Sequence, residues 1–415
     1  AEEQSAIEAF TETYRRINAE FVGESEPGEL LEGAIEGMFE TLDDPYSAYM
    51  GPDEYESTFA GINGEFEGIG ARMNTEDPDG TACEPISDAC QLRVIEVLPD
   101  TPALGAGLLA GDIVRAVDGR VLDGQTIDDA VMLIRGPRDS EVVLSLERDG
   151  EAQDLAITRD TIVSQDVRSA VLADGDVGYL RIDGFSARAS DEFEDALRAQ
   201  MEAGIDKLVV DVRDDPGGFV DTAVEITSEF LADGPVFWEE NAEGAQRSID
   251  VTGGGLATDH DLDLVVLIDD GTASASEILA GALQDAGRAE LVGERSFGKG
   301  TVQEWTQLSG GNGGFRLSIA KWLTRDKTWI DGTGLTPDAE VADSGSRYRP
   351  DDPDSDPAAD AQLQRAIMLL LGDDAVGASP APSPMAADLA GLDSAPASST
   401  TWQPTPSPSA SATPE

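Results

Sequence analysis

Apolar residues near the start of the chain recur at spacings of three and four, a pattern that predicts two amphipathic helices. The first apolar stripe consists of Ile7, Phe10, Tyr14, Ile17 and Phe21. After a Pro-Gly break, the second stripe consists of Leu31, Ile35, Met38 and Leu42. Two short helices cannot bury such stripes by themselves. We therefore expect this helical segment, residues 1–60, to pack on the body of the protein or on a second copy of the chain.

The pattern changes after residue 64, where two longer units follow. Residues 64–158 combine alternating runs such as RVIEVLP and EVVLSLERDG with two short helical runs, which predicts a compact α+β unit. Residues 160–345 alternate apolar strands (GYLRI, KLVVDV, LVVLI) with helices, which predicts βαβ crossovers and a largely parallel sheet. Functional sites in such sheets gather at the carboxyl ends of the strands.

The last stretch, residues 346–415, differs in composition. It is first rich in Asp and Pro, contains one short apolar run over 366–371, and ends in a Pro/Ser/Ala/Thr-rich tail. Such a segment buries too little apolar surface to offset the entropy of ordering it, so we expect it to be largely disordered. The fold prediction is a multidomain chain that combines α/β and α+β units.

The chain is strongly acidic, with a formal net charge of −56. Proteins that bind nucleic acids need Lys and Arg to displace counterions from phosphates, so this charge argues against a nucleic-acid partner. Only four lysines are present: Lys207, Lys299, Lys321 and Lys327. No run approaches the ~20 apolar residues of a membrane-spanning helix. Because the sequence starts at AEEQSAIEAF without Met, we expect a mature or trimmed product.

Two cysteines, Cys83 and Cys90, lie close together in the polar stretch TEDPDGTACEPISDACQLR. We favour a short disulfide that pins a loop, which is typical of an oxidising, extracytoplasmic compartment. The alternative is a pair of unrelated thiols in a surface loop.

The chain holds a single histidine, His260, in the polar loop TDHDLD. A Ser–His–Asp hydrolase needs a dry imidazole oriented by a carboxylate, so we read His260 as a solvated loop residue rather than a catalytic base. A His/Cys metal cluster lacks ligands, and neither a Walker A nor a Rossmann motif is present. We expect no metal and no cofactor.

The strongest local signal is LVVLIDDGTASASEILAGALQD, in which an apolar strand ends at a Gly-Thr-Ala turn and a helix begins near Ser274. Small neighbours let a substrate backbone approach the Ser274 hydroxyl, and a helix N-terminus offers free N–H groups to an oxyanion. Ordinary helix capping explains the same residues.

Lys299 lies between two glycines in ERSFGKGTVQ, where a tight backbone suits a buried position. A lysine that acts as a base must drop from its reference pKa of about 10.4 to roughly 7–8, a change of about 4 kcal/mol that burial can supply. A surface lysine in a salt bridge is the alternative.

The run GTASASEILAGALQDAGRAELVGERSFGKGTVQ strongly resembles the serine-to-lysine segment of the carboxyl-terminal processing proteases, peptidase family S41. The motifs ETLDDPYSAYMGPDEYE, DKLVVDVRDDPGG and DGTGLTPD extend the resemblance over residues 30–345. It implies a crotonase-like α/β protease core with Ser274 as nucleophile, Lys299 as general base and Gln303 as the residue that orients the lysine. It also implies an oxyanion hole of backbone N–H groups from Ala275 and the Gly217–Gly218 pair, with Asp285 in a supporting role.

The same resemblance implies that residues 64–158 are a PDZ-like domain. Its Gly68-Ile69-Gly70 turn would offer backbone N–H groups to a peptide carboxylate while the peptide adds as a strand; a plain hairpin is the alternative reading of this turn. Arg135 is expected to couple peptide binding to the alignment of Lys299 and Gln303.

Two acidic departures from the family pattern lie near the expected oxyanion hole. Where the family commonly has Asn in its Arg-x-Asn-Pro-Gly-Gly loop, this chain has DVRDDPGG, with Asp214 and Asp215, and Asn is also usual near Asp269. Carboxylates that point inward would oppose an oxyanion, so we read them as part of the acidic bias of the chain.

The sequence thus predicts an extracytoplasmic (secreted, periplasmic or cell-wall-associated) serine endopeptidase that cleaves extracytoplasmic proteins near their C-termini. Its partners would be unstructured or C-terminal segments of proteins, and the N-terminal helices would serve a homodimer. The alternatives are a catalytically inactive peptide-binding scaffold with the same fold and a crotonase-like acyl transferase.

Overall fold

The computed structural model describes residues 2–23, 26–77, 83–148, 150–259, 261–352 and 355–372. His260 and the residues after 372 lie outside this range. Within it, no helix is long and apolar enough to cross a membrane.

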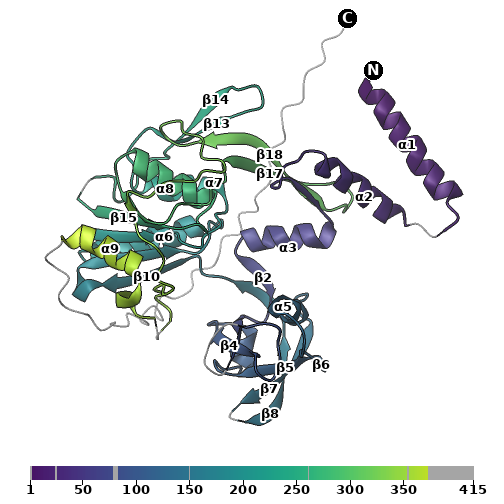
Figure 1. Cartoon of the computed structure of the whole chain (residues 1–415), viewed down its shortest axis with the longest axis horizontal. Helices are drawn as coiled ribbons and strands as arrows, with labels where there is room; N and C mark the ends of the chain where they lie inside the picture. The colour runs from purple at the N-terminus through teal and green to yellow at the C-terminus, as the bar shows by residue number, and fades with distance from the viewer. Residues whose placement is uncertain are drawn as a thin grey trace, which may run out of the picture. The chain divides into compact units, whose positions relative to one another are not determined.

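The N-terminal segment contains three helices and a short strand (Figure 1): α1 (Glu2–Glu20), α2 (Pro27–Glu40), β1 (Ala48–Met50) and α3 (Pro52–Ile62). Prolines at the start of α2 and α3 suit the first helical turn, where a missing N–H costs nothing. The apolar stripe of α1 stays exposed, with Phe10 at 48% and Phe21 at 59%. The expected helical pattern is present, and its first stripe is not buried.

The next unit is an antiparallel sheet with two short helices, as residues 64–158 predict. Its strands follow the order β3-β4-β5-β7-β8, with β6 added to β5. The bounds are β3 (Ala71–Glu76), β4 (Gln91–Val97), α4 (Pro102–Ala106), β5 (Ile113–Val117), β6 (Arg120–Val121), α5 (Ile127–Ile134), β7 (Glu141–Arg148) and β8 (Glu151–Thr158). A two-stranded antiparallel ribbon, β2 (Glu65–Gly68) with β9 (Asp160–Val163), joins the unit to the rest of the chain.

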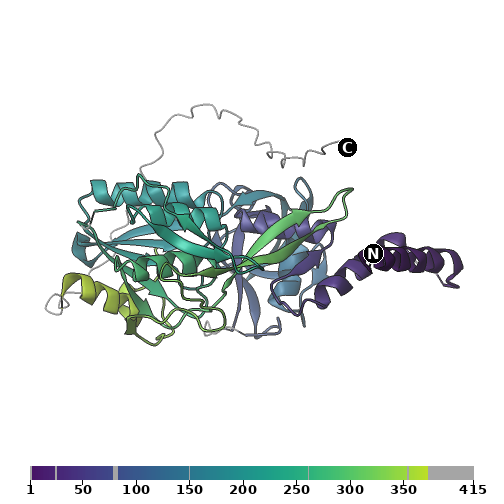
Figure 2. The same ribbon diagram turned by 90° about the horizontal axis from the view of Figure 1, so that it is seen from above.

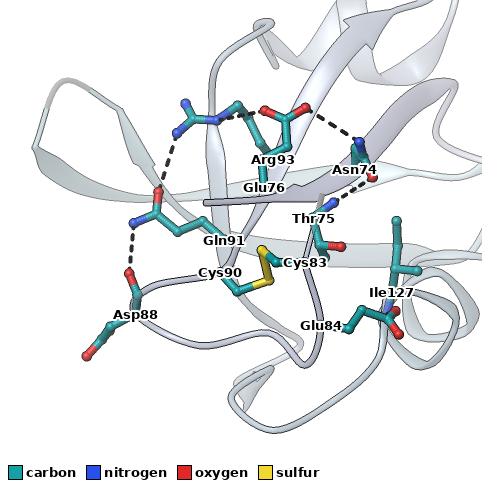
Figure 3. Close-up of a disulfide and its surroundings, with 10 residues drawn as sticks. All are labelled: Asn74, Thr75, Glu76, Cys83, Glu84, Asp88, Cys90, Gln91, Arg93 and Ile127. Atoms are coloured by element: carbon teal, nitrogen blue, oxygen red, sulfur yellow. Dashed lines mark hydrogen bonds and ion pairs between the residues drawn. A yellow bond between two sulfur atoms is a disulfide. The ribbon is translucent and has the colours of Figure 1, made fainter. Parts of the chain in front are cut away.

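A disulfide joins Cys83 to Cys90 beside the β3–β4 hairpin (Figure 3). The loop that it closes also reaches α5, because Glu84 Oε1 accepts the Ile127 N–H at 3.1 Å. The cross-link therefore fastens a loop that caps the first turn of that helix.

The third unit is built on a six-stranded sheet of order β10-β11-β12-β15-β16-β19. Only β10 runs antiparallel; the other neighbours pair in parallel, as the βαβ pattern predicts. The strands are β10 (Val167–Leu172), β11 (Val177–Ile182), β12 (Lys207–Asp211), β15 (Asp263–Ile268), β16 (Glu290–Gly293) and β19 (Ala339–Glu340). A 3-10 turn, η1 (Ala173–Gly175), links β10 and β11.

Side chains that alternate along these strands belong to two different apolar cores. Leu208 and Val210 pack with α6 (Ala189–Glu202), α7 (Val220–Ser228) and α8 (Ala275–Asp285). Val209 lies in the other core, with residues of α9 (Ala361–Leu371). Because side chains alternate along a strand, the sheet is covered on both faces (Figure 2).

Helix α9 lies inside the range that the sequence assigns to the tail. It follows a 3-10 turn, η2 (Pro357–Ala359), and buries Leu363, Ala366 and Ile367. The expectation of disorder is therefore wrong for the stretch up to Leu371, because its short apolar run finds a ready-made sheet face to cover. The remainder of the expected tail lies outside the described residues.

A second, antiparallel sheet completes this unit. The segment that carries Lys299 leads into this sheet. Its order is β1-β18-β13-β14, with β17 also paired to β18. The bounds are β13 (Pro235–Glu240), β14 (Gln246–Asp250), β17 (Thr301–Gln307) and β18 (Gly314–Leu323). Through β1, the N-terminal segment becomes an edge strand of this sheet.

Candidate active site

Ser274 lies at the turn between β15 and α8, at the carboxyl end of a central parallel strand. Its backbone angles, φ 57° and ψ −114°, belong to a region that L-residues with side chains avoid. Holding such a conformation costs about 1–3 kcal/mol, which the surroundings must supply. Residues in strained turns of this kind cluster at catalytic sites, so the geometry favours a nucleophile over an ordinary cap.

Asp269 holds this turn in place from the end of β15. Its Oδ1 atom accepts the N–H groups of Gly271 and Thr272, both at 3.0 Å, and that of Asp214 at 3.0 Å. The Asp214 contact ties the Ser274 turn to the loop that follows β12.

Glu277, in the first turn of α8, joins the Ser274 turn to the lysine loop. Its Oε2 atom accepts the N–H groups of Ser274 and Lys299, both at 2.9 Å. Its Oε1 atom accepts the Gly298 N–H at 2.7 Å and the Ser296 hydroxyl at 2.5 Å. The carboxyl is fully buried, and burial raises its pKa against the lowering effect of these four hydrogen bonds. The sequence analysis missed Glu277, although its place three residues after Ser274 matches a capping box.

Lys299 is mostly withdrawn from solvent on its loop. Burial lowers the pKa of its amine; Arg316 lowers it further, and Glu277 and Asp44 oppose the change. The Nζ atom lies 5.2 Å from the centre of the Tyr46 ring, which belongs to the N-terminal segment. A depressed pKa is what a general base near neutral pH requires.

The structure does not join the three expected catalytic side chains by hydrogen bonds. Within the described residues, Lys299 Nζ makes none to Ser274 or Gln303. The Gln303 amide donates instead to Thr301 Oγ1 at 2.7 Å and to Ser318 Oγ at 3.4 Å. Glu277 thus brings the two backbone segments together, while the side chains are not engaged with each other.

The expected oxyanion loop lies directly against the nucleophile turn. A Cβ atom on Gly217 would fall 2.7 Å from the Ala273 carbonyl oxygen and 3.0 Å from the Ser274 Cβ, so only glycine fits there. The Gly217 N–H donates to Asp215 Oδ1 at 2.9 Å. No described residue accepts the N–H groups of Gly218 or Ala275. Of the Gly217–Gly218 pair, Gly218 therefore has the free donor.

Asp215 is fully buried beside this loop, and its Oδ2 atom has no hydrogen-bond partner among the described residues. Burial raises its pKa well above the ordinary value of an aspartate. A neutral aspartic acid has the shape of asparagine and, like it, offers one acceptor and one donor. In that protonated form, the departure from Asn would add no charge beside the expected oxyanion loop.

Asp285 is not part of this cluster. It ends α8, and its Oδ2 atom accepts the Asp326 N–H at 2.8 Å. Ten residues of helix separate it from Ala275, a rise of about 15 Å. Any support that it gives to Ser274 passes through the helix.

The turn Gly68-Ile69-Gly70 lines a groove of about 510 Å³, together with Arg135. No described residue accepts the N–H groups of Ile69 and Gly70. The Arg135 guanidinium lies over the Phe66 ring, 5.5 Å from its centre. No hydrogen bond or ion pair links Arg135 to Lys299 or Gln303 in the described part of the chain.

Among the described residues, no group of three or more His, Cys, Asp or Glu side chains is arranged to hold a metal ion. Three features therefore meet around Ser274: a serine in a strained backbone conformation, a lysine of lowered pKa, and backbone N–H groups without an acceptor among the described residues.

Three family models match parts of this chain. The profile of Peptidase family S41 matches residues 176–341, that of the Activating protease CtpB N-terminal domain matches residues 1–54, and that of the PDZ domain matches residues 93–148. A putative S41 protease from Bacteroides fragilis has the same fold, with a TM-score of 0.58 at 16% identity over 81% of this chain and 90% of that one.

Two curated relatives extend the match to most of the chain. The carboxy-terminal-processing protease of Bartonella bacilliformis is 36% identical over 342 residues, which cover 80% of this chain and 74% of the relative. The carboxy-terminal processing protease CtpA of Bacillus subtilis is 34% identical over 339 residues, covering 81% and 69%. On this similarity and its PDZ-containing fold, the chain belongs to the carboxy-terminal-processing proteases, serine peptidases of family S41.

Proposed function

We propose that this protein is an endopeptidase that cleaves extracytoplasmic proteins near their C-termini, with Ser274 as nucleophile and Lys299 as general base. Neutral Lys299 takes the proton of the Ser274 hydroxyl as its Oγ attacks the peptide carbonyl. The N–H groups of Gly218 and Ala275 stabilise the oxyanion. The lysine then protonates the leaving amine, and water hydrolyses the acyl-enzyme with Lys299 again as base. No metal or organic cofactor is needed.

The observation that supports this proposal most directly is the Glu277 carboxylate, which binds the N–H groups of both Ser274 and Lys299. A single buried group thereby fixes the separation of the nucleophile segment and the base segment. The lowered pKa of Lys299 supports its role as a base. Gln303 would orient the lysine amine once its amide leaves Thr301 and Ser318.

The described conformation is best understood as a resting state. The Lys299 amine lies over Tyr46 rather than against Ser274, so the productive contacts require a rotation of its side chain. We propose that a substrate C-terminus promotes this change when it binds the groove at Gly68, Ile69 and Gly70. Arg135, which lines the same groove, would transmit the binding event.

Two further parts of the proposal rest on separate observations. The Cys83–Cys90 disulfide supports an extracytoplasmic location, because such bonds persist in oxidising compartments. The exposed stripe of α1 supports a homodimer in which two N-terminal segments cover each other.

Cleavage of casein by the purified chain tests the proposal, beside the variants Ser274→Ala and Lys299→Ala. The parent should cleave, and both variants should be inactive while their circular dichroism spectra stay unchanged. An inactive parent would be retested with apolar peptides that carry a free C-terminal carboxylate, with their amidated forms as the control. Continued inactivity would instead support the binding-scaffold alternative.

A further inference from the structure

Two carboxylates, those of Asp214 and Asp269, lie where the expected oxyanion loop meets the Ser274 turn. Asp269 is fully buried at the end of β15, and Asp214 lies in the loop after β12 with its side chain about half exposed. Uncompensated negative charge at this place would repel an oxyanion and push the two loops apart.

Arg347 supplies the nearest compensating charge from a segment far along the chain; Arg349 and Arg181 lie farther from Asp214 Oδ2, at 3.8 and 4.0 Å. Arg347 follows β19, and its side chain is 17% exposed. Its Nη1 atom lies 2.5 Å from Asp214 Oδ2 and 2.5 Å from Asp269 Oδ2, and its Nη2 atom lies 2.9 Å from Asp343 Oδ2. The first two contacts are ion pairs to both loops at once, so the guanidinium bridges them.

The two oxygens of Asp269 have separate partners. Oδ1 accepts the N–H groups of Asp214, Gly271 and Thr272, while Oδ2 faces Arg347. An asparagine at 269 would keep the first set but present its NH2 group to a guanidinium, which has only donors. Asp269 and Arg347 are therefore matched, and changing either one alone leaves the other unsatisfied.

A short path leads from this bridge to the reacting groups. The Asp215 carbonyl accepts the Ala273 N–H at 3.0 Å and the Ser276 hydroxyl at 3.1 Å, on both sides of Ser274. Gly217, two residues further, is packed against the Ser274 Cβ. A shift at Asp214 is thus passed to the oxyanion donors without any contact between Arg347 and the substrate.

The same C-terminal segment holds the oxyanion loop at a second point. Arg213, which is fully buried, donates to Asp360 Oδ2 at 2.8 Å and to Gln362 Oε1 at 2.8 Å. Asp360 is also the N-cap of α9. The C-terminal segment therefore holds the loop by two charged contacts, Arg347 with Asp214 and Asp360 with Arg213.

We infer that Arg347 is a positioning residue of the active site, which keeps the oxyanion loop seated on the Ser274 turn by pairing with Asp214 and Asp269. This inference rests on the proposed function, since its main readout is cleavage.

The test compares Arg347→Gln, the double variant Asp214→Asn/Asp269→Asn, and the triple variant that combines all three changes. Arg347→Gln should lower kcat by on the order of 10- to 100-fold, with KM changed less than twofold, because the loops shift without loss of substrate contacts. The double variant should also lose activity. The triple variant should recover to within about threefold of the parent, because it carries neither the carboxylates nor the guanidinium. Arg247→Gln, a change at an exposed ion pair, is the matched control.

Hydrogen exchange followed by mass spectrometry gives a readout that does not need activity. Exchange over residues 213–218 and 269–276 should rise in Arg347→Gln and return to the parental rate in the triple variant, while β17 and β18 stay unchanged. If Arg347 had only a general structural role, the triple variant would not recover activity.

The inference is overturned if Arg347→Gln keeps kcat within twofold of the parent, or if the triple variant has a lower kcat than Arg347→Gln. If Arg347→Gln fails to fold, a triple variant that folds and has a near-parental kcat still supports the inference. A parent that never cleaves, but whose exchange pattern responds as stated, refutes the proposed function and leaves the positioning role intact.

Discussion

Replacing Glu277 with Gln changes one oxygen of a buried group that accepts four hydrogen bonds. The N–H groups of Ser274 and Lys299 both point at Oε2, so the amide oxygen should take that position. The new NH2 group then faces the Gly298 N–H and the Ser296 hydroxyl. The hydroxyl can turn and accept, but the Gly298 N–H loses its acceptor.

The expected loss of stability follows from that one N–H. A buried donor without a partner costs about 1–3 kcal/mol. Removing a carboxylate whose pKa is raised by burial returns part of this cost, so we expect a net loss of about 1–2 kcal/mol. For a unit of this size, the loss lowers Tm by roughly 2–8 °C. Activity should fall more steeply, on the order of 100-fold, because Ser274 and Lys299 shift together.

Tryptophan fluorescence is the suitable probe for this melt. None of the five tryptophans lies within residues 64–158, so the signal follows the protease unit and not the PDZ domain. Glu225→Gln, at an exposed position of α7, is the matched control. If Glu277→Gln melted and cleaved like the parent, the carboxylate could not be the link between the two segments.

Three further predictions concern pH and the disulfide. Activity should rise as the pH passes the pKa of Lys299, which is lowered from its ordinary 10.5, because the neutral amine is the base. The Arg316 guanidinium lowers this pKa, so Arg316→Gln should move the midpoint of the activity profile to higher pH. A shift of the midpoint to lower pH would contradict the assignment. Burial raises the pKa of Asp215 above its ordinary 3.8, so the parent protein loses stability as the pH rises past 3.8. Asp215→Asn should therefore raise Tm by a few degrees at pH 7 but not at pH 3. An equal gain in Tm at both pH values would refute the protonation of Asp215 in the folded protein. The double variant Cys83→Ser/Cys90→Ser opens a short loop and should destabilise the PDZ domain by about 2.5 kcal/mol. Hydrogen exchange in β4 and β7 should become faster, while the melting curve followed by tryptophan fluorescence should not change.

The strand and helix pattern was predictable because burial leaves a local mark on the sequence. Val209 and Val210 belong to different apolar cores, as a strand covered on both faces requires, and the uninterrupted apolar stretch LVV in the run KLVVDV indicates this. The strained turn at Ser274 could be placed for the same reason, from a strand end, small residues and a helix start. The prediction of disorder was wrong for residues 361–371 because this helix is stabilised by the sheet face that it covers. The amino-acid composition of the segment does not indicate that contact.

The charged contacts of the site were harder to foresee because they join distant segments. Arg347 meets Asp214 and Asp269 across more than 70 residues of sequence, with no spacing rule to link them. Side-chain direction was equally hidden: Gln303 is where the motif places it, yet its amide turns to Thr301. Of the acidic residues that seemed unfavourable beside the expected oxyanion loop, Asp269 is paired with an arginine, and burial raises the pKa of Asp215.

The ribbon of β2 and β9 has a consequence for how this architecture can change. Gly68 lies opposite Asp160, so the chain leaves the protease unit and returns to it through adjacent strands. A module whose two ends are neighbours can be inserted or exchanged with little disturbance of its host. The PDZ domain and the protease unit are thus separable parts, and under the proposed function a different recognition module grafted at this ribbon would direct the same chemistry to other substrates.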